Sequence, residues 1–78
     1  MSSSMTVDFR HIRQRDGRAI KVCADVIARG NFLTWTATVH MFPAFFEMTG
    51  SVRKANDESD RHAVIGSIGQ ALAVGRLD

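Results

Sequence analysis

The sequence contains only one cysteine, one proline and one tryptophan, and no tyrosine, in 78 residues. Cys23 alone excludes an internal disulfide and provides no thiolate cluster for zinc. Because nothing here requires an oxidising compartment, we expect a cytoplasmic protein. No apolar run approaches the roughly 20 residues that a helix needs to cross a bilayer, so we expect no membrane partner.

The length and composition predict one small domain with one small core. Hydrophobic residues make up 45% and charged residues 23% of the chain, which is ordinary for a globular protein. Residues 1–5, MSSSM, lack the charged and apolar parts of a secretion signal, so we expect a disordered tail there and one domain over residues 6–78. Small domains without crosslinks are only marginally stable, and self-association is a common remedy.

The net charge of +2 is distributed unevenly along the chain. Residues 1–30 carry six Lys or Arg side chains against three Asp, whereas residues 56–78 carry two Arg against four acidic residues. A basic front attracts phosphate backbones, but it also fits a solvated surface or a surface that docks on the acidic end of another subunit.

Residues 19–29 and 32–41 predict a β-hairpin closed by Gly30-Asn31. In both stretches apolar and polar residues alternate, which is typical of strands that are buried on one face. A two-residue turn at this Gly aligns apolar residues with apolar partners, whereas a slip of one residue would place threonines opposite them. The predicted apolar pairs are Ala28–Leu33, Val26–Trp35, Ala24–Ala37, Val22–Val39 and Ile20–Met41.

The stretch HMFPAFFEM, residues 40–48, predicts the turn into a further strand. Pro43-Ala44 alone would make a poor two-residue hairpin turn, so we expect a four-residue loop, 42–45, that keeps the same register. Phe42 and Phe45 then lie in the loop, where they either fold over the open end of the core or stand exposed. The predicted pairs facing the core are Met41–Phe46, Val39–Met48, Ala37–Gly50 and Trp35–Val52.

Residues 6–14 predict an additional strand that precedes a turn at Asp16-Gly17. Ile12 would face outward in this strand. Because an arginine falls among the inward positions, the pattern is mixed, and we expect a bulge or a partly irregular strand. The residues that would face inward are Val7, Phe9, His11 and Arg13.

The last part of the chain predicts a helix. Asn56 or Asp57 fits the N-cap, and the acidic residues that follow favour the positive N-terminal end. Gly75 followed by Arg76 predicts the C-terminal end. The predicted apolar stripe consists of Val64, Ile65, Ile68, Ala71 and Leu72.

Gly66 and Gly69 each cost about 1 kcal/mol relative to alanine inside a helix, so they need a compensating role. We expect them to lie in a furrow that a row of small residues, Ala24, Ala37 and Gly50, forms across the sheet. The alternative is that the two glycines face a second molecule. Together the elements predict an α+β fold, (β)βββα: an antiparallel meander of three or four strands with one C-terminal helix packed on one face.

The open face of the predicted sheet offers little to catalysis. Lys21, His40 and Glu47 would form one row across the strands, but a flat face lacks a pocket, and the row fits a cross-strand charge ladder. Cys23 has no activating histidine beside it in this register. The three histidines lie on different predicted elements, so no metal site is expected. We therefore predict a protein that is not an enzyme and has no cofactor and no small-molecule substrate.

Two functions from different classes remain. A non-enzymatic protein-interaction module, forming a homodimer through the tip or the edge of the last hairpin, is predicted because exposed apolar patches mark interfaces. Its candidate interface residues are Phe42, Pro43, Ala44 and Phe45. The alternative is a regulatory protein that binds nucleic acid, including DNA, through the polar sheet face, although Asp25 and Glu47 on that face oppose it. Its candidate contacts are Arg10, Arg13, Arg15, Arg18, Lys21, Arg29 and Arg53.

Overall fold

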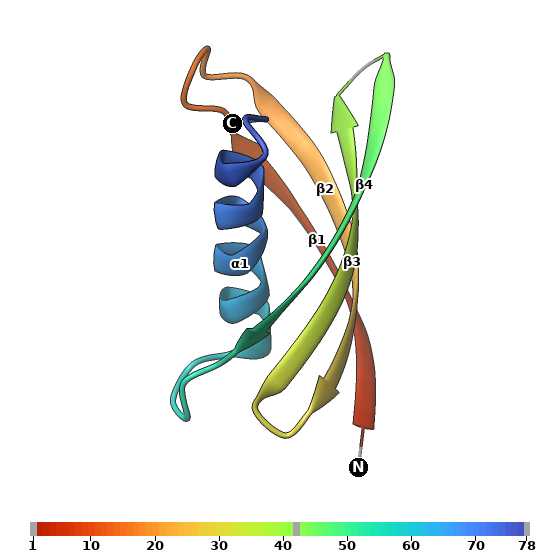
Figure 1. The fold of residues 1–78 in the computed structure, drawn as a ribbon, viewed down its shortest axis with the longest axis vertical. Helices are drawn as coiled ribbons and strands as arrows, with labels where there is room; N and C mark the ends of the chain where they lie inside the picture. The colour runs from red at the N-terminus through yellow and green to blue at the C-terminus, as the bar shows by residue number, and fades with distance from the viewer. Residues whose placement is uncertain (1, 42, 78) are drawn as a thin grey trace.

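A computed structural model describes residues 2–41 and 43–77, which form a four-stranded antiparallel sheet and one helix (Figure 1). The strands follow one another in the sheet in chain order, as a meander. This architecture confirms the predicted α+β fold, with the optional first strand present. The elements are β1 (Ser2–Ile12), β2 (Ala19–Arg29), β3 (Phe32–Met41), β4 (Ala44–Arg53) and α1 (Asp60–Val74).

The β2–β3 hairpin has the register that the sequence predicts. Val26 lies opposite Trp35 and Ala28 opposite Leu33. Gly30 adopts a φ of 60°, the left-handed conformation that glycine reaches without a steric cost. The alternating apolar residues of both strands face α1 and form most of the core, because the period of two places them on one side of the sheet. Ile27 and Phe32 are the exceptions and lie half-exposed on the outer face.

The register between β3 and β4 differs by two residues from the prediction. Met41 pairs with Ala44, so two residues rather than four separate the strands. Gly50 consequently lies opposite Trp35, in the place predicted for Val52. A Cβ atom on Gly50 would stand 2.5 Å from Trp35 Cζ2, so the indole fills the space that the glycine leaves free. The large ring and its small neighbour determine this pairing.

The first strand begins earlier than the sequence predicts. Residues 2–5, expected in a disordered tail, pair with the last residues of β2, while Met1 lies outside the described residues. β1 ends at Ile12, which is 58% exposed on the outer face as predicted. The chain then turns through residues 13–18, where Gly17 has a φ of 69° and its N–H bonds to the Arg13 carbonyl.

The helix begins at a different cap from the predicted one. Ser59 is the N-cap, and its hydroxyl accepts a hydrogen bond from the backbone N–H of His62 at 3.1 Å. Asn56, one of the two predicted caps, instead accepts a hydrogen bond from the Asn31 side chain across the end of the sheet. The helix ends at Gly75 as predicted, where the Gly75 N–H bonds to the Ala71 carbonyl.

The two helical glycines do not lie in a furrow of the sheet. A Cβ atom on Gly66 or on Gly69 would meet nothing within 4 Å, so neither glycine allows a close approach inside the chain. The predicted row of small residues is also broken, since Met48 rather than Gly50 lies opposite Ala37. The intramolecular explanation of the glycines is therefore wrong.

The helix is too short to cover the length of the sheet. Its 15 residues span about 22 Å at 1.5 Å per residue, whereas the 11 residues of β2 span about 36 Å. α1 starts beside the end of β4 and runs toward the β1–β2 turn, while the β3–β4 hairpin rises away from it (Figure 1). The inner face near Phe46 therefore lacks a helical cover, and Phe46 is 40% exposed although it faces the same side as the core.

Candidate protein-interaction surface

The tip of the β3–β4 hairpin, residues 43–46, exposes apolar side chains on both faces of the sheet. Phe45 is 66% exposed on the outer face, and Phe46 is 40% exposed on the inner face. Pro43 and Ala44 are also exposed, whereas Phe42 lies outside the described residues. The sequence predicted the exposure of Phe45 as one of two outcomes but assigned Phe46 to the core. The shortness of α1 explains that difference.

On the outer face, Phe45 packs against an imidazole. The rings of His40 and Phe45 meet edge to face, with centroids 5.0 Å apart and planes inclined by 78°. Lys21 lies opposite His40 on the other side. Phe45 thus takes the position that the predicted register assigned to Glu47, and Glu47 lies opposite Thr38 instead. The predicted row of a lysine, a histidine and a glutamate is wrong, because the register moved by two residues.

The outer edge of β4 is open to a partner strand. β4 and β1 are the edge strands of the sheet. At the β1 edge, the Arg61 guanidinium donates a hydrogen bond of 3.2 Å to the Asp8 carbonyl. A helix side chain therefore already uses one of the backbone acceptors of β1. No comparable side chain reaches the backbone of β4 within residues 2–41 and 43–77. An edge strand of ten residues without proline is a template for pairing.

The seven basic candidates separate into two groups at opposite ends of the sheet. Arg29 and Arg53 flank the half-exposed Phe32, because Phe32 pairs with both arginines. The other group lies at the end that carries the β1–β2 turn. Its members are Arg10, Arg13, Arg15, Arg18 and Lys21. Between the two groups lie rows that contain Asp8, Asp25 and Glu47. Hence no continuous cationic track runs along the outer face of the described strands.

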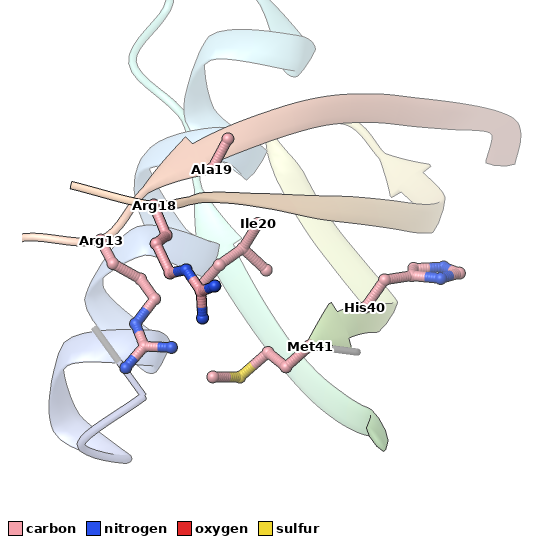
Figure 2. Close-up of a pocket in the computed structure, with 6 residues that line it drawn as sticks. All are labelled: Arg13, Arg18, Ala19, Ile20, His40 and Met41. Carbon is pink, nitrogen blue, oxygen red and sulfur yellow. The ribbon is translucent and has the colours of Figure 1, made fainter. Parts of the chain in front are cut away.

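A cleft of about 400 Å³ lies on the inner side, between the β1–β2 turn and the β3–β4 hairpin. Figure 2 shows the guanidinium groups of Arg13 and Arg18 reaching into it from the turn, beside Ile20 and toward the thioether of Met41. The His40 ring points away from this space. Arg15 does not join the other two arginines, because its guanidinium donates a hydrogen bond of 3.0 Å to the Arg76 carbonyl after the end of α1. Sequence reasoning missed the cleft, since it depends on how residues 13–18 fold back.

The single thiol has an environment that opposes nucleophilic chemistry. Cys23 lies opposite Asp8 in the neighbouring strand. The hydrogen bond with the Asp8 carboxylate raises the pKa of Cys23, and burial and the nearby negative charges raise it further. A thiol held in its protonated form is a poor nucleophile.

Neither a metal cluster nor a membrane-spanning helix occurs in the described part of the chain. No three His, Cys, Asp or Glu side chains among residues 2–41 and 43–77 are arranged to hold a metal ion. α1 lacks the length and the apolarity to cross a bilayer. Comparison with protein-family models, with curated protein sequences and with solved structures finds no match to this chain.

Proposed function

We propose that this chain is a protein-interaction module, not an enzyme, that forms a homodimer through β4 and the tip of the β3–β4 hairpin. The observation that carries the proposal is the pair of exposed phenylalanines, Phe45 and Phe46, on an edge strand whose outer side has no partner strand among the described residues. Exposed aromatic side chains next to free backbone N–H and C=O groups favour the addition of a strand. The cytoplasmic location stays a prediction from the single cysteine.

A specific register fits two copies of β4. A two-fold axis perpendicular to the sheet, passing at Thr49, keeps both helices on one side and pairs inner-face residues with inner-face residues. Phe46 then lies opposite Val52 of the second copy, so that the two apolar inner faces become continuous. The remaining pairs are Phe45–Arg53, Glu47–Ser51 and Met48–Gly50. Of these, Phe45–Arg53 brings a guanidinium to an aromatic ring, a favourable contact.

Self-association should be visible as a dimer at high micromolar concentration, and Thr49→Lys should weaken it. Thr49 is exposed on the outer face, so a lysine is tolerated in the monomer. In the dimer two lysines would stand directly opposite each other, and we expect the dissociation constant to rise by about tenfold or more. Sedimentation equilibrium of the original chain and of Thr49→Lys measures the two dissociation constants.

Thr6→Lys is the matched control, because Thr6 lies in the same cross-strand row at the β1 edge. This variant should dimerise like the original chain. A monomeric original chain would refute the proposal, and so would a dimer that Thr6→Lys breaks and Thr49→Lys leaves intact.

Nucleic-acid binding stays the alternative, and one feature favours it: Arg29 and Arg53 beside Phe32 resemble the aromatic and cationic contacts of single-strand binders. The acidic side chains between the two basic groups oppose it. A gel shift with mixed single- and double-stranded DNA distinguishes the two proposed functions. It is run at low salt, because binding to phosphates is strongest at low salt. The interaction module should show no shift.

A further inference from the structure

The cleft beside the β1–β2 turn combines a cationic wall with an apolar one. Its volume of about 400 Å³ falls within the range of ligand cavities, about 300–1,000 Å³. Arg13 and Arg18 provide the cationic wall, and Ile20 and Met41 provide the apolar one (Figure 2). Ile20 is buried and Met41 is half-buried, and both side chains lie on the inner face of the sheet.

The charges at the cleft do not balance within the described residues. Arg13 is only 15% exposed, and its Nε atom lies 3.6 Å from Asp16 Oδ1 without a hydrogen bond. The same carboxylate accepts a hydrogen bond from the backbone N–H of Arg18, so Asp16 holds Arg18 through its main chain and not through its guanidinium. Two guanidinium groups line the cleft and one carboxylate lies beside them, an excess of positive charge that suits an anionic ligand.

We propose that this cleft binds a small amphipathic monocarboxylate. The carboxylate lies between the guanidinium groups of Arg13 and Arg18, whose planar forks match its two oxygens. The aliphatic or aromatic body of the ligand lies against the half-buried Met41 and the edge of Ile20. Because Ile20 is only 3% exposed, the apolar surface removed from water belongs mainly to Met41 and to the ligand itself. The sequence predicted no small-molecule partner, because nothing in it shows that the turn folds toward the hairpin. The inference stands apart from self-association, since the edge of β4 takes no part in the cleft.

Titration with octanoate, followed by nuclear magnetic resonance, tests the proposal on the full chain. We expect saturable shifts of the Ile20 and Met41 methyl signals. The exposed residue Arg18 is suitable for substitution because its loss should not disturb folding. Arg18→Gln should weaken octanoate binding by about tenfold, the loss typical of a charge-assisted hydrogen bond. Arg29→Gln, which removes the same charge at the far end of the sheet and outside the proposed dimer interface, should leave the affinity unchanged.

Three further probes identify the chemistry of the site. Acetate and inorganic phosphate should bind much more weakly than octanoate if the apolar wall contributes. Octanol should bind much more weakly if the arginines contribute. The proposal is overturned if octanoate does not shift the cleft signals, if octanol binds as tightly as octanoate, if phosphate alone binds as tightly, or if both arginine variants weaken binding equally.

Discussion

Replacing Trp35 with alanine should lower the free energy of unfolding by about 3–5 kcal/mol, the usual cost of deleting a buried aromatic ring. Trp35 is the largest fully buried side chain. A chain of 78 residues has a total stability of about 4–12 kcal/mol at 0.05–0.15 kcal/mol per residue. This variant should therefore be largely or partly unfolded at room temperature. Urea denaturation followed by far-ultraviolet circular dichroism measures the loss.

One further variant tests the contribution of the indole N–H of Trp35, and a second serves as a control for the loss of an aromatic ring. The Trp35 indole N–H donates a hydrogen bond of 3.0 Å to the Ser67 hydroxyl, which joins the sheet to the helix. Ser67→Ala should cost about 1–3 kcal/mol, because a part-buried donor loses its partner. Phe32→Ala, at a half-exposed aromatic residue of the same strand, is the control and should cost clearly less than Trp35→Ala. Equal losses for Trp35→Ala and Phe32→Ala would contradict the packing described above.

Gly50→Ala should destabilise the protein by about 1–3 kcal/mol, although it adds only one methyl group. The new Cβ would lie 2.5 Å from Trp35 Cζ2 and 2.8 Å from Cε2, and both atoms belong to a rigid ring. The indole must therefore shift or β4 must move away. The chain has one tryptophan and no tyrosine, so its fluorescence emission reports on this site directly. We expect a lower denaturation midpoint together with an altered emission maximum.

Gly66→Ala is the matched control for Gly50→Ala and should have the opposite sign. Nothing lies within 4 Å of a Cβ at this helical position, so alanine should add up to about 1 kcal/mol of stability through its higher helix propensity. A neutral Gly50→Ala with unchanged emission would show that Trp35 does not occupy the space over the glycine. A destabilising Gly66→Ala would show that a neighbour fills the space above α1.

The β2–β3 hairpin could be predicted from the sequence because two separate signals agree there. The turn at Gly30 and the alternation on both strands allow one register, and a slip of one residue reverses the faces. The β3–β4 register could not be predicted in the same way. A slip of two residues keeps every side chain on its face, so alternation alone does not distinguish Gly50 from Val52 as the partner of Trp35. Close packing of the indole decides between them.

The candidate surfaces were only partly predictable for a related reason. Exposure of Phe45 follows from its place near the turn, but exposure of Phe46 depends on how far α1 reaches along the sheet. The helix starts at Ser59 and not at Asn56, because Asn56 bonds to Asn31 and holds the connection against the sheet end. The cleft depends on how residues 13–18 fold and on where Met41 lies relative to them. These segments are far apart in the sequence, so no local pattern predicts the cleft.

The unequal lengths of helix and sheet also divide the meander into two regions of different local stability. Near Val52, β4 lies under the helix, so separating it from β3 would expose the core to water. Near Phe46, the same two strands lack a helical cover, so fraying there exposes Val39, the buried residue opposite Phe46, but leaves the packing under α1 intact. The hairpin can thus loosen and adapt to an incoming strand while the remainder of the domain stays folded.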